Sequence, residues 1–543
     1  MNVTIKKHKN LSFMTVSILQ PLPLGNADFV QIRRNNALYV DKTAMLLELA
    51  TGDANRIILS RPRRFGKSML LSTLQSLFEH GTRDFHGLQI EGCWKEKSYP
   101  VVRLDLSSAS RFQNVSEFRE KFWRQLRIAF GPAGFKASSK EDTLEDLFCW
   151  LQSREKNSLV LLIDEYDAPV TDCLDRPELL GQVRNAMSDF LFALKQYEGA
   201  LRFLFVTGVT KASGTGLFSG FNSLKDISFD PAYSTLLGYT QEELVHYFGA
   251  HIDRAARRHG LSREALLDKL REFYDGFSFD TEGRTHVYCP WSVLSFFAST
   301  NFAFDNYWFQ TGGHPNVLLK HLARHGLDAP GEFDQLKPVF LSDLVSAASC
   351  EYWSAEVLLA QAGYLTIKAS DGAQVLLGCP NKEVYMSMAN LYARQMTKNG
   401  ASLTDANGMK PADVFSSQPA DKVIEFLNRM YNGLNYQHYP IKDEAGACSH
   451  LQTLLIGGAL MPEVEKHHAH GRSDLEVTAG RRRWVFEFKY ARRPAQTEAL
   501  LQEAIVQIRS RHYGETPHGL DLIRVAVVFD AQARQITAWR QID

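Results

Sequence analysis

The segment Ser60-Arg61-Pro62-Arg63-Arg64-Phe65-Gly66-Lys67-Ser68 carries the strongest structural signal in this chain. Before it, Arg56-Ile57-Ile58-Leu59 indicates a short buried strand, and after it residues 69–78 repeat apolar side chains at helical spacing. A strand, a loop ending in Gly-Lys-Ser and a helix, in this order, are typical of a phosphate-binding loop. In such a loop, backbone N–H groups face the phosphates, Lys67 supplies a positive charge and Ser68 offers an oxygen to Mg²⁺.

The loop departs from the usual pattern at one position, because Arg61 stands where a glycine is expected five residues before Gly66. We hypothesise that the basic run Arg61, Arg63 and Arg64 partly replaces that glycine by adding positive charge near the phosphates. The sequence predicts that the nucleotide is bound by Arg64, Phe65, Gly66, Lys67, Ser68 and Asp164.

A second apolar run ends in carboxylates, at Ser158-Leu159-Val160-Leu161-Leu162-Ile163-Asp164-Glu165-Tyr166-Asp167. A buried parallel strand whose carboxyl end opens into a ligand crevice has this pattern. We expect Asp164 to hold Mg²⁺ opposite Ser68, directly or through water, and Glu165 to orient and activate the attacking water. A core strand that simply ends in polar residues would look the same, so the pairing with the phosphate loop carries the interpretation.

Size and composition limit the classes of protein to consider. At about 100–200 residues per domain, 543 residues predict about two to four domains. The 61 basic and 61 acidic residues balance, so whole-protein charge gives no argument for nucleic acid. Seven scattered cysteines without a C-x-x-C pair favour a reducing cytoplasm over a disulfide framework or a cysteine zinc site. No apolar run approaches the roughly 18 residues of a membrane span, so no membrane association is expected.

Alternating strand and helix patterns between residues 55 and 210 predict an α/β layer with a mostly parallel sheet. The last strand of this layer, at 201–206, is followed by Thr207 and Thr210. Either threonine is a candidate for sensing the γ-phosphate, although a threonine that merely finishes a strand is an equally good interpretation.

From Thr240 onward helical patterns predominate, which predicts a helical middle region. Within it, a helix at 355–363 is followed by strands at 364–368 and 374–378 around an Asp-Gly turn. A helix followed by a hairpin is similar to a winged helix. Such a unit either contacts DNA or serves as a packing module, and the sequence leaves both possibilities open.

The C-terminal residues from about 440 predict the order helix, three strands, helix, strand. Glu487 and Lys489 are two apart on one predicted strand and share a face, with Asp474 on the neighbouring strand. Burying these charges is costly unless an ion compensates, and a divalent metal held by Asp474 and Glu487 would do so. Lys489 would then position or deprotonate the attacking water. A surface strand with an ordinary Glu–Lys pair has the same spacing.

Five arginines near this strand, Arg481, Arg482, Arg483, Arg492 and Arg493, form two short basic runs. They are candidates for binding a phosphate backbone. Solubility alone is an equally good explanation for arginines in turns.

The motifs taken together resemble the AAA-ATPase-like family of prokaryotic proteins. The resemblance rests on residues 39–43, 61–68, 162–167, 218–222, 237–240 and 274–277. Members commonly carry a C-terminal domain of the PD-(D/E)XK nuclease superfamily, and Gly471-Arg472-Ser473-Asp474 with Phe486-Glu487-Phe488-Lys489-Tyr490 is similar to its motif. The family also has arginine at the position of Arg61. The resemblance covers nearly the whole chain from about residue 22, and it implies a P-loop ATPase that uses ATP and Mg²⁺, coupled to a restriction-endonuclease-like fold.

We therefore predict four parts: an N-terminal arm (1–22), a P-loop domain (23–238), a helical and winged-helix-like region (239–435) and a nuclease-like α/β domain (436–543). The predicted catalytic residues are Glu165, Asp474, Glu487 and Lys489, and the predicted metal ligands are Ser68, Asp164, Asp474 and Glu487. The expected function is ATP hydrolysis coupled to Mg²⁺-dependent cleavage of DNA in the bacterial cytoplasm, in defence or DNA processing. The alternative is a nucleotide-dependent regulatory or nucleic-acid-binding switch that does not cleave. A homo-oligomer is left open.

Overall fold

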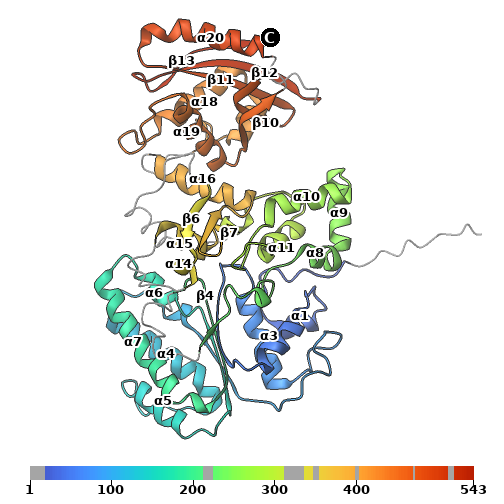
Figure 1. Cartoon of the computed structure of the whole chain (residues 1–543), viewed down its shortest axis with the longest axis vertical. Coiled ribbons are helices and arrows are strands. Elements are labelled where there is room, and N and C mark those ends of the chain that lie inside the picture. The colour runs from blue at the N-terminus through green and yellow to red at the C-terminus, as the bar shows by residue number, and fades with distance from the viewer. Residues whose placement is uncertain are drawn as a thin grey trace, which may run out of the picture.

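A computed structural model of the chain describes residues 19–211, 224–310, 335–345, 354–397, 403–468, 471–511 and 519–542. The molecule is elongated and has three tiers: the N-terminal domain, the middle region and the C-terminal domain (Figure 1). Most of the predicted N-terminal arm lies outside the described residues. Within those residues, no helix is both long and apolar enough to cross a membrane.

The N-terminal domain is built on a five-stranded parallel sheet with the order β2-β3-β4-β1-β5. Its strands are β1 (Arg56–Ser60), β2 (Val101–Asp105), β3 (Leu159–Asp164), β4 (Leu201–Gly208) and β5 (Lys225–Asp226). Every residue of β1 and β3 is buried, because helices cover both faces of the sheet. The predicted parallel α/β layer is confirmed. The strand of the phosphate loop, β1, and the strand of the acid pair, β3, both pair with β4.

Two groups of helices pack on this sheet (Figure 1). On one side lie α1 and α3, and on the other α4, α5 and α7. The helices of the domain are α1 (Phe29–Arg34), α2 (Thr43–Thr51), α3 (Lys67–His80), α4 (Val115–Phe130), α5 (Thr143–Gln152), α6 (Ala168–Asp172) and α7 (Pro177–Gln196).

The middle region is mainly helical, as predicted, and includes a small sheet with the order β6-β8-β7. Its helices are α8 (Gln241–Tyr247), α9 (Gly249–His259), α10 (Arg263–Tyr274), α11 (Pro290–Ala298), α12 (Tyr307–Gln310), α14 (Leu341–Val345), α15 (Ala355–Ala362) and α16 (Lys382–Met396). Its strands are β6 (Lys337–Phe340), β7 (Thr366–Ser370) and β8 (Gln374–Gly378). The predicted helix and hairpin are α15, β7 and β8.

The C-terminal domain contains a mixed sheet with the order β13-β12-β11-β10-β9, in which β11 and β12 are parallel. Its elements are α17 (Pro411–Ser417), α18 (Ala420–Asn432), α19 (Glu444–Gly457), β9 (Pro462–His468), β10 (Gly471–Ala479), β11 (Arg482–Ala491), α20 (Thr497–Ser510), β12 (Asp521–Asp530) and β13 (Gln535–Ile542). The predicted order of helix, three strands, helix and strand is confirmed, and β13 is an additional edge strand. The predicted boundary at 435 places α17 and α18 in the middle region, but both helices are hydrogen-bonded to the C-terminal sheet. Trp484 Nε1 of β11 donates to the Phe415 carbonyl of α17 at 2.9 Å, and Asn428 Nδ2 of α18 donates to the Ile536 carbonyl of β13 at 2.9 Å.

Candidate active sites

The phosphate loop joins β1 to α3, and its glycine caps the helix. Gly66 has φ +92° and an added Cβ there would meet nothing within 4 Å, so the left-handed backbone, not crowding, favours glycine. Lys67 Nζ folds back over the loop and donates to the carbonyls of Arg61 at 2.8 Å and Pro62 at 3.0 Å. Burial lowers the pKa of Lys67, and the nearby Glu165 carboxylate opposes that shift. When a nucleotide binds, its phosphates would replace the Arg61 and Pro62 carbonyls as the hydrogen-bond acceptors of the Lys67 amine.

The structure brings together Ser68 and Asp164, which the sequence predicts as Mg²⁺ ligands. Ser68 Oγ donates to Asp164 Oδ2 at 2.7 Å, and Thr207 Oγ1 donates to Asp164 Oδ1 at 2.7 Å. Arg103 Nη2 lies 3.8 Å from Asp164 Oδ2. Because β4 lies between β1 and β3, its Thr207 can reach across and fix the orientation of this carboxylate. A hydroxyl and an oriented carboxylate side by side fit a Mg²⁺ ion that also binds phosphates.

Glu165 occupies an unusual backbone position at the end of β3. Its φ of +48° lies in the left-handed region, which is rare for a residue with a side chain and clusters at functional sites. Burial raises the pKa of Glu165, while the Lys67 charge lowers it. Glu165 lines the cavity beside Lys67, as its predicted role in orienting water requires.

Asp167 braces the end of β4, a role that the sequence analysis missed. Asp167 Oδ2 accepts from the backbone N–H of Thr210 at 2.6 Å and from its hydroxyl at 2.7 Å. The Thr210 hydroxyl is thus committed to a carboxylate, which weighs against its predicted role as a phosphate sensor. Only glycine fits at position 208 in this arrangement, because an added Cβ would lie 2.5 Å from the Tyr166 ring.

Arg61 does not place its charge near the phosphates, so that part of the hypothesis is wrong. Its side chain is 1% exposed, and its guanidinium donates to the carbonyls of Ser228 and, at 3.2 Å, of Tyr233. The Arg61 Cζ atom also lies 4.2 Å from the centroid of the Phe279 ring. Burial lowers the pKa of Arg61 to about 9. Two hydrogen bonds to backbone carbonyls and one ring contact make Arg61 a structural tie between the loop and the chain that follows the sheet.

The phosphate loop faces a cavity of about 1170 Å³ between the N-terminal domain and the middle region. Aromatic residues of the middle region form part of its wall, namely Tyr239, Trp291, Trp308 and Tyr364. Arg64 Cζ lies 4.2 Å from the centroid of the Trp291 ring, and Trp308 Nε1 donates to the Arg63 carbonyl at 3.3 Å. These aromatics could not be found from the sequence, because nothing local links them with a loop that ends more than 170 residues earlier.

The winged-helix-like unit packs against the loop. Gly363, which ends α15 with φ +90°, lies so close that an added Cβ would be 2.7 Å from Pro62 Cβ. Leu358 and Ala362 of α15 line the same cavity, and Gln361 Oε1 accepts from the Lys211 backbone N–H at 3.1 Å. The helix before the hairpin is therefore engaged by the N-terminal domain, which favours the packing role over DNA contact through this helix.

In the C-terminal domain the structure brings Asp474, Glu487 and Lys489 together on β10 and β11. Asp474 Oδ2 accepts from the Phe488 backbone N–H at 2.7 Å, and Lys489 Nζ donates to Glu487 Oε1 at 3.1 Å. Burial, reinforced by the Asp474 charge, raises the pKa of Glu487 to about 7. Although burial disfavours its charged form, neighbouring carboxylates raise the pKa of Lys489. A cationic Lys489 suits charge stabilisation better than removal of a proton from water.

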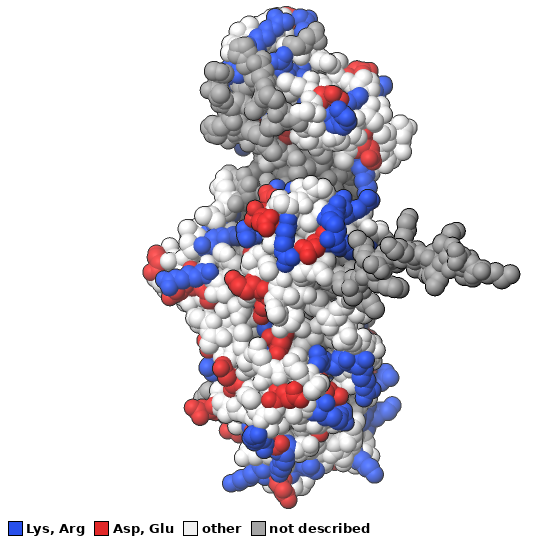
Figure 2. Space-filling model, turned by 90° about the vertical axis from the view of Figure 1, so that its right-hand side faces the viewer, with Lys and Arg blue, Asp and Glu red and all other residues white. Residues whose placement is uncertain are grey.

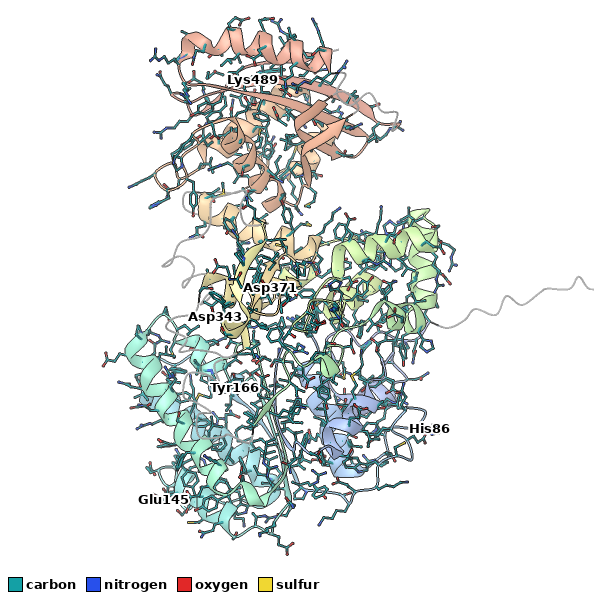
Figure 3. All side chains as sticks on the ribbon, in the orientation of Figure 1. His86, Glu145, Tyr166, Asp343, Asp371 and Lys489 are labelled. Atoms are coloured by element: carbon teal, nitrogen blue, oxygen red, sulfur yellow. The ribbon has the colours of Figure 1, made fainter. Side chains whose placement is uncertain are left out.

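Glu444, the first residue of α19, also belongs to this site and was missed. Its Oε1 lies 3.5 Å from Lys489 Nζ, and burial raises its pKa. The sequence offered one signal, an acidic residue just ahead of a predicted helix, but that position is common for solvated carboxylates. Figure 3 places Lys489 in the C-terminal tier and Tyr166, beside the acid pair, in the N-terminal tier, so the middle region separates the two sites.

The C-terminal carboxylates fit a Mg²⁺ ion that takes its remaining ligands from water and phosphate. Glu487 is fully buried, and its Oε2 atom has no hydrogen-bond partner in the structure. An orphaned buried carboxylate oxygen is costly unless a cation or proton satisfies it. Among the described residues no three His, Cys, Asp or Glu side chains form a complete metal cage. One or two carboxylates are the usual protein contribution to a Mg²⁺ site.

Two of the arginines proposed to bind phosphate are engaged inside the domain. Arg483 is 4% exposed and pairs with Glu476 Oε2 at 2.9 Å, and Arg482 Nη1 donates to the Gln418 carbonyl at 2.6 Å. For the buried Arg483 the phosphate-binding hypothesis is wrong, whereas Arg482 is half-buried and Arg481, Arg492 and Arg493 are exposed. On the face shown in Figure 2, Lys and Arg side chains are interspersed with Asp and Glu side chains, in keeping with the balanced charge.

Comparisons with known proteins find matches to two families in separate parts of the chain. Residues 23–218 match the family described as "Predicted AAA-ATPase", and residues 451–539 match the PD-(D/E)XK nuclease superfamily. A protein of Azotobacter chroococcum mcd 1, described as "Uncharacterized protein in vnfD 5'region", is 30% identical over 494 residues. That alignment covers 89% of this chain and 91% of the relative.

Proposed function

Because this chain belongs to the AAA-ATPase-like family and carries a C-terminal PD-(D/E)XK nuclease-superfamily domain, we propose that it hydrolyses ATP and cleaves DNA. ATP hydrolysis takes place at the phosphate loop, and cleavage takes place at Asp474, Glu487 and Lys489. The observation that carries the proposal is the pair of assembled sites, each with a buried carboxylate beside a lysine.

At the phosphate loop, the N–H groups at the start of α3 and the Lys67 amine bind the β- and γ-phosphates. Ser68 and Asp164 hold the Mg²⁺ ion, which neutralises phosphate charge when bound. Glu165 orients the attacking water and accepts its proton, a task favoured by the burial that raises its pKa. Thr207 keeps the Asp164 carboxylate in one orientation.

At the C-terminal site, Asp474 and Glu487 hold the Mg²⁺ ion, which supplies charge stabilisation when bound. Lys489 remains cationic and stabilises the negative charge that develops on the phosphate. Glu444 positions the Lys489 amine through its ion pair at 3.5 Å. The Phe488 N–H fixes the Asp474 carboxylate at 2.7 Å, so both carboxylates are oriented before substrate arrives.

We further propose that nucleotide binding controls the C-terminal site through a chain of direct contacts. The first link is Trp308, whose indole donates to the Arg63 carbonyl at 3.3 Å and whose backbone N–H donates to Glu383 Oε1 at 2.8 Å. Glu383 stands in the first turn of α16. A shift of the phosphate loop therefore acts on one end of α16.

The second link is the pairing of α16 with α19. Asn390 Nδ2 donates to the Gly457 carbonyl at 2.7 Å, and an added Cβ at Gly457 would lie 2.6 Å from Ala393 Cβ. This close approach makes the two helices move as one packed unit. The opposite end of α19 carries Glu444, which pairs with Lys489, so the contacts run without a gap from one site to the other.

The bacterial cytoplasm is the proposed location. Cys93, Cys149, Cys173, Cys289, Cys379 and Cys448, in the described part of the chain, are all free thiols. Free thiols are the normal state in a reducing compartment.

The test is a cleavage assay with plasmid, linear and single-stranded DNA, Mg²⁺ or Mn²⁺, and with or without ATP. We expect cutting by the wild type and none by Asp474→Ala or Lys489→Ala. Binding without cutting on every substrate would instead support a nucleotide-dependent switch that does not cleave. Hydrolysis of ATP at the wild-type rate by Lys67→Ala would refute the assignment of the phosphate loop.

Coupling is tested separately with Asn390→Ala, which removes the hydrogen bond between α16 and α19. Both basal activities should remain, whereas the change in cutting on addition of ATP should shrink. An ATP effect equal to that of the wild type would contradict the route through these helices.

A further inference from the structure

Arg63 differs from the other arginines of the phosphate loop. Arg63 and Arg64 are both exposed and line the same cavity as Lys67 and Glu165. Arg61 is buried beneath the loop, and the Arg64 guanidinium lies over the Trp291 ring. In the part of the chain that the structure describes, no hydrogen bond, ion pair or ring contact engages the Arg63 guanidinium. Of the three charges in this run, that of Arg63 is available to a ligand in the cavity.

The backbone of Arg63 is fixed from the outer side of the loop. Trp308 Nε1 donates to the Arg63 carbonyl at 3.3 Å, and the preceding Pro62 lies against Gly363. A side chain that extends from a fixed backbone loses less conformational freedom when a ligand binds. The loop therefore extends the Arg63 side chain into the cavity from a fixed backbone position.

The charge of Arg63 acts on the groups that flank the expected γ-phosphate. Burial is the main influence on both neighbours and lowers the pKa of Lys67 while raising that of Glu165. The side chains of Arg63, Lys67 and Glu165 line one cavity, and the Arg63 charge lowers the pKa of both neighbours. A phosphate held by Lys67 and attacked by a water on Glu165 would thus lie within reach of Arg63.

We propose that Arg63 supplies, from within the same chain, the cation that stabilises the γ-phosphoryl group during hydrolysis. This inference rests on the proposed ATPase function and makes Arg63 a catalytic residue of that reaction. The water oxygen bonds to the γ-phosphorus as the bond from that phosphorus to the β–γ bridging oxygen breaks. ADP leaves with the electron pair, and the proton passes to Glu165 and then to solvent, giving ADP, phosphate and a proton.

The chemistry of arginine suits this position. Negative charge is spread over the γ-oxygens in the transition state, and a planar guanidinium with five N–H donors can contact two of them at once. An arginine in this role usually reaches the phosphate from a partner protein or from another part of the same chain. Here the loop that binds the phosphates would itself carry it, so hydrolysis would not require a neighbouring subunit.

The test compares Arg63→Ala with Arg111→Ala, which removes another exposed arginine that lines the same cavity. We expect Arg63→Ala to lower kcat for ATP about 100-fold or more, with a change below about threefold in the Kd of a non-hydrolysable ATP analogue. Arg63→Lys should recover part of kcat, and Arg111→Ala should leave it unchanged. An unaltered kcat in Arg63→Ala, or an equal loss in Arg111→Ala, overturns the proposal.

A mixing experiment separates action within one chain from action between chains. Arg63→Ala retains nucleotide binding, whereas Lys67→Ala loses it, so the proposed ATPase and the role of Arg63 fail in distinguishable ways. If Arg63 acts within its own chain, an equimolar mixture of the two variants has the sum of their separate activities. Recovery of ATP hydrolysis above that sum would show an arginine acting across subunits and would overturn the proposal.

Discussion

Glu383 offers a test of the middle region through its buried carboxylate. It is fully buried at the start of α16, where Oε2 accepts from Ser292 Oγ at 2.6 Å and Oε1 from the Trp308 N–H at 2.8 Å. Burial raises the pKa of Glu383 to about 8, against 4.5 for an ordinary glutamate. The perturbation is Glu383→Gln, which keeps the shape and cannot ionise.

The sign of the effect follows from proton binding. Between about pH 4.5 and 8 the folded protein holds a proton on Glu383 that the unfolded chain has lost, so stability falls as pH rises through this window. A shift of about 3.5 pKa units corresponds to at most about 5 kcal/mol, at about 1.4 kcal/mol per pH unit. The glutamine amide cannot accept one of the two hydrogen bonds, which costs roughly 1 kcal/mol at every pH.

Glu383→Gln should therefore be less stable than the wild type by about 1 kcal/mol near pH 4 and more stable by about 3–4 kcal/mol near pH 8.5. The measurement is urea unfolding followed by tryptophan fluorescence, taking the transition that includes the middle region. Glu120→Gln, at an exposed position on α4, is the matched control and should show no crossover. A difference between Glu383→Gln and the wild type that stays constant within about 0.5 kcal/mol from pH 5 to 8.5 would refute the reasoning.

Three further outcomes are expected. Arg483→Ala removes the cation beside the buried Glu476 carboxylate and should destabilise the C-terminal domain by about 3–5 kcal/mol in thermal unfolding, whereas the exposed Arg481→Ala should not. Gly363→Ala forces a Cβ into the phosphate loop and should weaken ATP binding about tenfold in a titration, whereas Gly372→Ala has a similar φ in open space and should leave it unchanged. Since the pKa of Glu487 is about 7, calorimetry should show Mn²⁺ affinity falling about tenfold per pH unit below pH 7, and Glu487→Gln should abolish that dependence.

The elements with a strong one-sided pattern could be predicted from the sequence. Helices α4 and α10 are examples, since each buries a single face. The central helix α16 was missed because it is buried on several sides, so its apolar residues show little contrast between faces. The edge strand β13 was missed because its exposed residues interrupt the alternation. Strand order could not be predicted, since it depends on contacts between distant segments.

The residues of the candidate sites also fall into two groups, those that a local sequence pattern predicts and those that it does not. Residues inside a motif, such as Ser68, Asp164 and Glu487, were predicted because the motif itself states their spacing. Glu444 and Trp308 reach the sites from helices elsewhere in the chain, and no local pattern records such a contact. Arg61 was misjudged for a different reason: its position in the loop was known, but a long side chain can turn away from the ligand and form structural contacts instead.

The contacts between the middle region and the phosphate loop restrict how the loop can respond to a bound nucleotide. Pro62 is pressed against Gly363, the Arg63 carbonyl is held by Trp308, and Arg64 lies over Trp291, so consecutive loop residues all contact the middle region. A loop held in this way can adjust to phosphates only if the surrounding residues adjust with it. Because packed interiors shift between discrete arrangements more readily than they deform, phosphate binding would select one arrangement of the middle region. Through α16, the middle region would then transmit the presence of bound nucleotide to α19, and no separate residue that senses the γ-phosphate would be needed. The Thr210 hydroxyl is therefore free to serve a structural role, as a hydrogen-bond donor to Asp167 at the end of β4.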